Sequence, residues 1–285
     1  MKLVTLTSDL GLADHYVANL KGMLYSAVKS IEIADVSHLI QPFNIAQAAY
    51  CINNCWRVFP KGTVHFLCVD SLPVINIGNP DRNLYPVVMK LNGHYFVGCD
   101  NGIFSLIENY QQAETIIRID FSAAGLELKN ANKSIYVPTI QKILAGDSLD
   151  KIGEEVNTVR QVFVPQPVVE KNLIKGAVAH VDKYGNAISN ITKQLFDSVG
   201  QGHPFILYFK NSGYYIDQIS DNYNDVPMGE KLALFNENDL LEIAINKGTP
   251  GNGGGAATLL GIGERSTLRI EFQPRGSKNS LEELF

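Results

Sequence analysis

Carboxylates follow two apolar stretches of this chain, at positions where a polar ligand could be held. Asp9 comes shortly after an expected strand over Leu3–Leu6, and Asp70 directly ends the apolar run Val64–Val69. Open α/β sheets bind ligands just beyond the carboxyl ends of such strands. One aspartate can hold both hydroxyls of a cis-diol, and a second can activate a water. The structural alternative is equally simple, because aspartate is also common in turns.

A third carboxylate, Asp14, stands beside His15 in the same N-terminal segment. Apolar residues recur at helical spacing after it, which predicts a helix over Tyr16–Val28. Aspartate is a favoured residue at the start of a helix, so we expect Asp14 to cap this one. Binding a ligand is the alternative role.

Two loops in the second half of the chain carry side chains suited to a flat ligand. The turn Asp182–Asn186 follows an expected strand over Ile174–Val181, and Asn246 with Lys247 follows another over Leu240–Ile245. Tyr184 could stack on a ring while Asn186 reads a donor and acceptor edge. Ordinary turn chemistry explains the same residues. The glycine-rich run 251–255 lacks the ending of a phosphate-binding loop and is expected to be a mobile loop.

The elements expected around these residues predict an α/β protein in two parts. Strands and helices alternate over residues 1–165, and Asn92-Gly93 marks a hairpin, which together predict a largely parallel or mixed sheet. The stretch Val164–Pro167 contains two prolines and is expected to be a stiff extended link. Residues 170–285 consist mostly of short strands separated by turn residues, which indicates a smaller all-β, barrel-like domain.

Composition and charge exclude several classes of protein. The 285 residues carry a net charge of −5 with no Lys/Arg-rich run, so neither a nucleic acid nor a membrane is an expected partner. Strand-like sequence begins at Leu3, and we expect no leader and a cytoplasmic location. The four cysteines and six histidines show no metal-ligand spacing. We therefore expect neither a metal nor an organic cofactor.

The order of several short motifs resembles the S-adenosyl-L-methionine hydroxide adenosyltransferase family, whose relatives include fluorinase and chlorinase. The resemblance runs through most of the chain, and the combination is specific although each piece is short. The matching segments are Thr7–Asp14, Lys21-Gly22, Ile33–His38, Pro42-Phe43, Phe59–Val64, Val69-Asp70, Gly98–Gly102, Val181–Asn186 and Leu241–Asn246.

The resemblance implies a homotrimer that cleaves S-adenosyl-L-methionine (SAM) at subunit interfaces, with hydroxide or halide displacing methionine at the ribose C5′. It implies that Asp9 holds the ribose hydroxyls, that Phe43 lines the ribose, and that Asp70 is the catalytic carboxylate of the hydrolase branch. Further implied contacts fall to these residues: Asp14 and Asp182 for the methionine ammonium, Tyr184 for adenine stacking, and Asn186, Asn246 and the Lys247 backbone for the adenine edge.

The sequence departs from the hydrolase pattern around the catalytic aspartate. The family places an arginine seven residues after it, whereas the arginine available here is Arg82, in a longer loop. The family's catalytic histidine falls in a stretch that corresponds to Lys129–Ser134, which contains no histidine. Glu237 stands where a small polar residue is expected near the methionine end.

Three functions remain open on the sequence. The first is a SAM hydrolase with Asp70 as its central catalytic residue and Arg82 or Asn130 compensating for the missing partners. The second is a catalytically weak protein that binds SAM or a nucleoside. The third is a hydrolase or lyase for another adenosyl substrate, with Glu237 reading its tail. A halogenase fits least, because Asp70 places a negative charge where a halide must bind.

Overall fold

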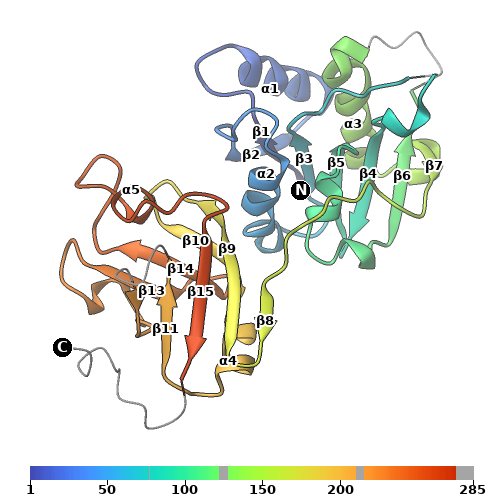
Figure 1. Ribbon diagram of the computed structural model, residues 1–285. Helices are drawn as coiled ribbons and strands as arrows, with labels where there is room; N and C mark the ends of the chain where they lie inside the picture. Colours follow the sequence, from blue (N-terminus) through green and yellow to red (C-terminus); the bar gives the residue numbers. More distant parts are fainter. Residues whose placement is uncertain (77, 122–127, 210–214, 274–285) are drawn as a thin grey trace, which may run out of the picture. The chain divides into compact units, whose positions relative to one another are not determined.

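The computed structural model describes residues 1–76, 78–121, 128–209 and 215–273. The chain forms two compact units, Met1–Val164 and Pro165–Phe285, and the division falls within the proline-containing link (Figure 1). Residues 274–285, which end the second expected domain, lie outside the described residues, as does Tyr214 in an expected strand.

A mixed sheet forms the centre of the N-terminal unit, as expected. Among the described residues it has seven strands in the order β2-β1-β3-β5-β4-β6-β7. The strands β2, β1, β3 and β5 run parallel, whereas β4, β6 and β7 are antiparallel to their neighbours. Their bounds are β1 Lys2–Ser8, β2 Ile31–Ser37, β3 Val64–Cys68, β4 Pro86–Leu91, β5 His94–Cys99, β6 Thr115–Ile119 and β7 Gly153–Glu155.

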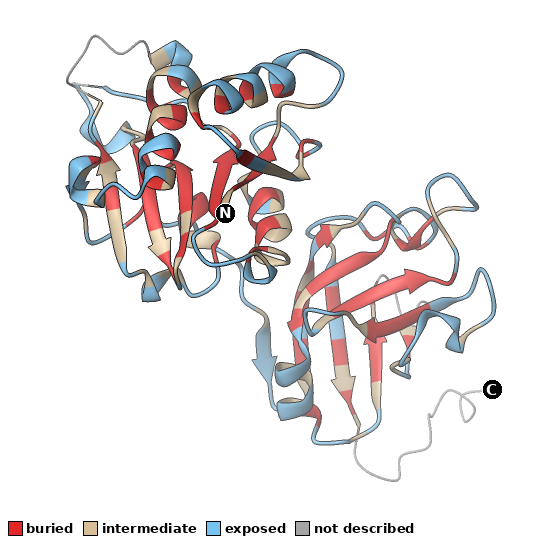
Figure 2. Ribbon diagram, turned by 180° about the vertical axis from the view of Figure 1, so that it is seen from behind, coloured by how far each residue is buried: buried red, intermediate tan, exposed pale blue. Residues whose placement is uncertain are grey.

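Helices cover both faces of this sheet. Leu20 and Leu24 of α1 (Tyr16–Ala27) share a buried cluster with Ile140 of α3 (Val137–Ala145), whereas Ile52 of α2 (Ile45–Asn53) belongs to a second cluster. All five residues of β3 are buried (Figure 2). A strand buried on both faces reads as a continuous apolar run, which is the pattern that predicted it.

Helix ends differ from the expectations in two places. Helix α1 begins at Tyr16 with His15 as its N-cap residue, and no side chain makes the capping hydrogen bond, so the predicted cap by Asp14 is wrong. The apolar pattern of the sequence has helical period over Ile45–Phe59, but α2 ends at Asn53 and gives way to a short 3-10 helix. The 3-10 helices among the described residues are Trp56–Val58, Pro80–Arg82, Ile103–Leu106, Tyr110–Gln112, Leu128–Asn130, Leu149–Lys151 and Tyr223–Asp225.

Two turns follow the residues that predicted them. The hairpin between β4 and β5 places Asn92 at φ +50° and Gly93 at φ +77°, a left-handed pair that suits the twist of the strands. Helix α3 ends at Gly146, which has φ +85°. Its start was not expected, because a π-helix over Asn132–Tyr136 leads directly into it.

The C-terminal unit is a nearly closed, barrel-like antiparallel sheet, also as expected. Its described strands follow the order β12-β11-β15-β9-β10-β14-β13, with β8 paired to β9. The strands are β8 Val168–Glu170, β9 Leu173–Val181, β10 Ala187–Thr192, β11 Phe205–Tyr208, β12 Tyr215–Ile216, β13 Lys231–Phe235, β14 Leu240–Ile245 and β15 Thr267–Phe272. The sequence did not predict β8, β10 or the helices α4 (Lys193–Gly200) and α5 (Ala256–Leu259).

Candidate active site

The carboxyl ends of β1 and β3 lie side by side, and each is followed by one of the predicted aspartates. Ser8 pairs with Cys68 in the parallel register of the two strands, so Asp9 and Asp70 emerge at the same edge of the sheet. The chain passes from β1 to β2 on one side and then returns to β3 on the other. This edge is therefore the topological switch point, where open α/β sheets bind ligands.

Asp9 connects two loops that are distant in the sequence. Its Oδ2 accepts hydrogen bonds from the backbone N–H of Phe43 at 2.9 Å and from that of Asp70 at 3.4 Å. Both donor residues have left-handed backbone, with φ +65° for Phe43 and +44° for Asp70. Such conformations cost roughly 1–3 kcal/mol each and cluster at functional sites. Asp9 thus helps to hold Asp70 in a strained but defined position.

Asp70 is partly buried beside a second negative charge. Burial raises the pKa of its carboxyl group, and the charge of Asp9 raises it further. Asn101 Nδ2 donates to the carbonyl oxygens of Val69 and Asp70, both at 3.0 Å. A carboxylate with raised proton affinity is suited to accept a proton from water.

Asn101 was not among the predicted site residues. The signal was present, because Asn101 follows β5, the next parallel strand beyond β3, at the same edge of the sheet. Its amide ties the end of β3 in place from the side opposite Asp9.

Arg82, the predicted catalytic partner of Asp70, is exposed at the end of the 3-10 helix Pro80–Arg82. The loop is attached to the rest of the unit by Arg160, whose Nη2 donates to the carbonyl oxygen of Asp81 at 2.7 Å. The structure thus brings Asp9 and Asp70 together, and the pairing of Arg82 with Asp70 stays a prediction.

The π-helix packs against the segment that follows β3. Tyr136 Oη donates to the carbonyl oxygen of Ser71 at 2.7 Å, and Cys68 Sγ lies 3.8 Å from Asn132 Oδ1. Burial raises the pKa of the Tyr136 hydroxyl well above its usual value, so it stays protonated as a donor. π-Helices are frequent at functional sites. This one overlaps the stretch in which the family carries its histidine.

The remaining predicted residues of the N-terminal unit are at its surface. Phe43 is 73% exposed although its backbone is fixed by Asp9, and Asp14 is exposed in the loop before α1. An exposed aromatic ring beside a carboxylate is able to pack against a sugar or a base.

Asp182, in the C-terminal unit, is held by its own turn. Its Oδ1 accepts from the backbone N–H groups of Tyr184 at 2.8 Å and Asn186 at 2.9 Å, and its Oδ2 accepts from Asn186 Nδ2 at 3.2 Å. The turn also includes Gly185 at φ +81°. The Tyr184 side chain is 60% exposed and is therefore able to stack on a flat ligand.

The other predicted binding residues of this unit differ in exposure. Asn186 and Asn246 are buried, and Asn246 Nδ2 donates to the carbonyl oxygen of Val226 at 2.7 Å. Lys247 is exposed with left-handed backbone, φ +58°. Glu237 is exposed next to a tight turn. Their proposed contacts with a ligand stay predictions.

A buried carboxylate, Glu242, was not among the predicted site residues. It is 3% exposed, and its oxygens accept from Tyr223 Oη at 2.7 Å and from Asn236 Nδ2 at 3.3 Å. Burial raises the pKa of Glu242, and the charge of Asp182 adds to the shift. An acidic residue inside the apolar strand Leu240–Ile245 is the signal that could have found it.

The glycine-rich run 251–255, expected to be a mobile loop, packs on the turn Asp182–Asn186. A side chain at Gly255 would meet the carbonyl oxygen of Tyr184 at 2.3 Å, so only glycine fits there. Ala257 N–H donates to the carbonyl oxygen of Gly185 at 2.8 Å.

Family models place the whole arrangement among known proteins. The SAM hydroxide adenosyltransferase N-terminal domain matches residues 4–153, and the C-terminal domain of the same family matches residues 176–269. The chain belongs to the SAM hydroxide adenosyltransferase family. The resemblance drawn from its motifs is thereby confirmed.

Individual SAM hydroxide adenosyltransferase relatives carry two kinds of name. A Methanocaldococcus jannaschii protein named (R)-S-adenosyl-L-methionine hydrolase is 29% identical over 68% of this chain and 68% of its own length. A Nocardia brasiliensis protein named fluorinase is 37% identical over 70% of this chain and 75% of its own. A crystal structure of an uncharacterized conserved protein from Thermotoga maritima superimposes with a TM-score of 0.77 at 26% identity, covering 94% of this chain and 99% of that one.

Groups for metal or thiol chemistry do not gather in the part of this SAM hydroxide adenosyltransferase that the structure describes. Its residues include no cluster of three or more His, Cys, Asp or Glu suited to a metal ion. Burial raises the pKa of Cys55 and of Cys68 to about 11, so these thiols stay protonated at neutral pH. Within the same residues, no helix is both long and apolar enough to cross a membrane.

Proposed function

We propose that this protein is a SAM hydrolase that forms adenosine and methionine. A water or hydroxide oxygen bonds to the ribose C5′ as the C5′–S bond breaks, and the electron pair of that bond stays on the sulfur of methionine. The proton of the attacking water passes to Asp70. The sulfonium is already a good leaving group, so positioning the nucleophile is the main task, and no metal or organic cofactor is needed.

The observation that carries this proposal is the contact between Asp9 and Asp70 at the switch point of the sheet. Asp9 Oδ2 is engaged with two backbone N–H groups, and we assign its Oδ1 to the ribose hydroxyls. Asp70, whose pKa is raised by burial and by Asp9, then accepts the proton of the nucleophile. The hydrolase name of the M. jannaschii relative supports the same reaction.

Carboxylates of the C-terminal unit suit the cationic end of SAM. Asp182 lies close enough to Glu242 for its charge to raise the pKa of Glu242. We assign Asp182, with Asp14, to the methionine ammonium. Tyr184 is assigned to stacking on adenine, and Asn186, Asn246 and the Lys247 backbone to its edge.

A second candidate is a SAM- or nucleoside-binding protein with little turnover. It is favoured by two observations. Arg82 is exposed at the end of a separate 3-10 helix, and the stretch Lys129–Ser134, which the π-helix overlaps, lacks the histidine that the family carries there. A different adenosyl substrate, with Glu237 at its tail, is the third. Halide transfer is disfavoured, since Asp70 would repel the halide.

We propose further that the protein is a cytoplasmic homotrimer with its sites at subunit interfaces. Apolar side chains in loops after β1, β2 and β3 are exposed in the single chain, which supports burial by another copy. They are Leu12 at 64%, Leu39 at 68%, Phe43 at 73% and Leu72 at 56%. Sedimentation equilibrium at micromolar concentration tests this, and a monomer mass would contradict it.

The deciding experiment incubates the purified protein with SAM and separates the products by chromatography. We expect adenosine and methionine, and a fall in kcat of about 10²–10⁴-fold in Asp70→Asn with binding retained. Asp147→Asn, which changes an exposed aspartate of the same unit, is the matched control. Binding of SAM without products supports the second candidate, and an unchanged kcat in Asp70→Asn removes Asp70 from the mechanism.

A further inference from the structure

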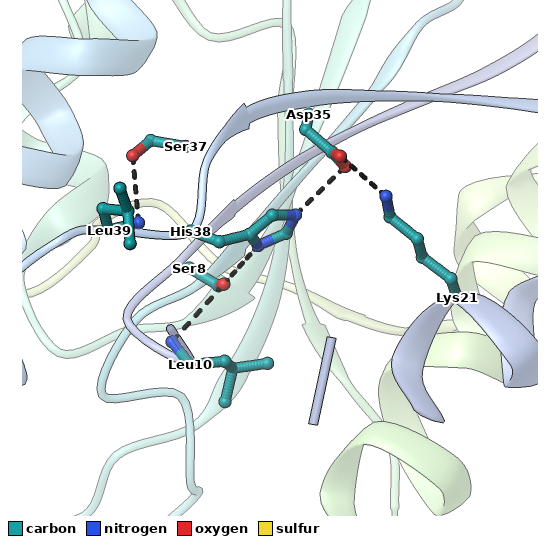
Figure 3. Close-up of polar contacts among 7 residues, drawn as sticks. All are labelled: Ser8, Leu10, Lys21, Asp35, Ser37, His38 and Leu39. Carbon is teal, nitrogen blue, oxygen red and sulfur yellow. Dashed lines mark hydrogen bonds and ion pairs between the residues drawn. The ribbon is translucent and has the colours of Figure 1, made fainter. Parts of the chain in front are cut away.

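A chain of four polar side chains runs from helix α1 to the turn that carries Asp9 (Figure 3). Lys21 Nζ donates to Asp35 Oδ2 at 2.6 Å, and Asp35 Oδ1 lies 3.0 Å from His38 Nε2. His38 Nδ1 then lies 2.6 Å from Ser8 Oγ. These residues come from α1, from β2 and the loop after it, and from the last position of β1.

An irregularity in the sheet makes this chain possible. Leu6 pairs with Asp35 but Thr7 pairs with Ser37, so β2 contains one additional residue relative to β1. Side chains three apart on a regular strand point to opposite faces, and a bulge of this kind re-aims them. Asp35 and His38 therefore meet although they are three residues apart.

The chain ends on the backbone that surrounds Asp9. Ser8 Oγ accepts from the N–H of Leu10 at 3.5 Å and is hydrogen-bonded to His38 Nδ1, while the other ring nitrogen, Nε2, faces Asp35. The His38 carbonyl oxygen also accepts from Gly11 N–H at 2.8 Å, and Gly11 has φ +70°. The residues on both sides of Asp9 are thus held by His38, directly or through Ser8.

Serine, histidine and aspartate are also the residues of hydrolytic triads, but this set is not one. Ser8 is fully buried, at 0% exposure, and has no access to a substrate. The serine lies on Nδ1 and the aspartate on Nε2, which reverses the arrangement that activates a nucleophilic serine. These linked side chains fix the position of the turn that carries Asp9 and do not supply a nucleophile.

Charge stabilises the outer end of the chain. Burial alone would raise the pKa of Asp35, but hydrogen bonds and charge from Lys21 and His38 outweigh it, so the pKa is lowered. Asp35 is therefore ionised at neutral pH and fixes the Nε2 side of the His38 ring. The opposite ring nitrogen, Nδ1, is thereby directed at Ser8 Oγ.

We propose that His38 and Asp35 are positioning residues of the site. They fix the turn Ser8–Gly11, and through Asp9 Oδ2 they fix the backbone of Asp70, without touching the substrate themselves. This inference rests on the proposed function for its kinetic consequence, but the order of the turn is a property of the ligand-free protein.

The test compares Asp35→Asn and His38→Asn with the wild type. His38→Asn keeps a polar group able to hydrogen-bond to Ser8 and loses the link to Asp35, so we expect it to be milder than His38→Ala. The control is Glu114→Gln, because Lys90 and Glu114 form an ion pair of 2.7 Å with similar exposure elsewhere in the same unit. Lys21→Arg keeps the positive charge beside Asp35, so we expect it to be more active than Lys21→Met.

Two readouts separate positioning from general stability. We expect the amides of Leu10 and Gly11 to exchange hydrogen about 10-fold faster or more in Asp35→Asn, with global unfolding unchanged, because their acceptors are no longer held. We also expect kcat/KM for SAM to fall about 10–100-fold, divided between kcat through Asp70 and KM through Asp9.

The outcomes also separate this inference from the proposed function. A wild type that neither binds nor cleaves SAM refutes the proposed function, and amide exchange alone then decides the inference. Unchanged exchange at Leu10 and Gly11 overturns the inference. So do unchanged kcat and KM in an active enzyme, and so does an equal loss in Glu114→Gln.

Discussion

Asp9 and Asp182 occupy similar places in the sequence and very different places in the structure. Each follows a strand and lies in a turn with glycine two or three residues on. Asp9 Oδ2 binds the N–H groups of Phe43 and Asp70, which are 34 and 61 residues away. Asp182 binds the N–H groups of Tyr184 and Asn186, two and four residues away.

This difference separates two ways of building a site. The C-terminal turn is held by local contacts, so its geometry is present whenever the turn forms. The N-terminal site depends on β1, β2 and β3 being assembled, because its donors come from loops after different strands. We therefore expect the two units to respond differently to any perturbation that acts on the N-terminal sheet.

The largest expected difference is the response to acid. His65 of β3 is fully buried, its Nδ1 lies 2.8 Å from Thr5 Oγ1 of β1, and its Nε2 lies 3.1 Å from His94 Nδ1. Burial, together with the charge of His94, lowers the pKa of His65 from 6.5 to about 3. In the unfolded chain the imidazole protonates near pH 6.5. Between about pH 6.5 and pH 3 the unfolded state therefore binds one proton that the folded state does not bind.

Stability should therefore fall as the pH drops from about 6.5 towards 3, by about 1.4 kcal/mol per pH unit and ~5 kcal/mol in all. Denaturant unfolding from pH 7 to 4 checks this against His65→Gln, which cannot titrate. We expect the free energy of unfolding of the wild type to decline more steeply than that of the variant. Parallel curves would mean that His65 is not held neutral in the fold.

The next effect is the loss of ligand binding in Asp9→Ala. The change removes the acceptor of both long-range N–H bonds and the proposed ribose contact, so we expect affinity for SAM or adenosine to fall about 100-fold or more. Calorimetry measures it. Asp9→Asn keeps an acceptor oxygen and should retain more affinity, and unchanged binding in Asp9→Ala would refute the site.

Much of the fold could be predicted because its signals are local. The apolar run Val64–Val69 predicted a strand buried on both faces, and Asn92-Gly93 predicted the hairpin. Strand β10 (Ala187–Thr192) was missed because half of its residues are polar, and α4 because it is only eight residues long. In β10 the strand forms despite this weak local pattern because it pairs with β9 and β14.

The site was predictable only in part, for the same reason. The positions of Asp9 and Asp70 after parallel strands follow from the pattern of elements. The bonds from Phe43 and Asp70 to Asp9, and those of Asn101 to the end of β3, join segments far apart in the sequence. No local rule indicates such pairings, since they depend on strand order and on left-handed backbone.

A smaller effect is expected when the local turn is broken. Asp182→Ala removes an acceptor for two backbone N–H groups and for Asn186 Nδ2. We expect a loss of about 1–2 kcal/mol in unfolding free energy, similar to the loss of a helix cap. Asp221→Ala, at an exposed aspartate of the same unit, is the control. A loss of N-terminal amide protection in Asp182→Ala would break the distinction between the two sites.

The smallest effect is expected at Glu242, and its sign is opposite. Because burial raises the pKa of Glu242 above the 4.5 of the unfolded chain, the stability it contributes is present below pH 4.5 and is lost as the pH rises through the folded value. Glu242→Gln keeps an acceptor for Tyr223 Oη and removes the charge. Thermal unfolding at pH 4 and pH 8 should show that the variant is more stable than the wild type at pH 8 and about equally stable at pH 4. The gain at pH 8 should be smaller than the loss of stability in Asp182→Ala. Because the charge of Glu242 adds to the negative charge of Asp182, the same variant should lose more affinity for SAM than for adenosine, which lacks the cationic tail. Equal weakening for both ligands would place Glu242 in the framework of the barrel and not at the ammonium.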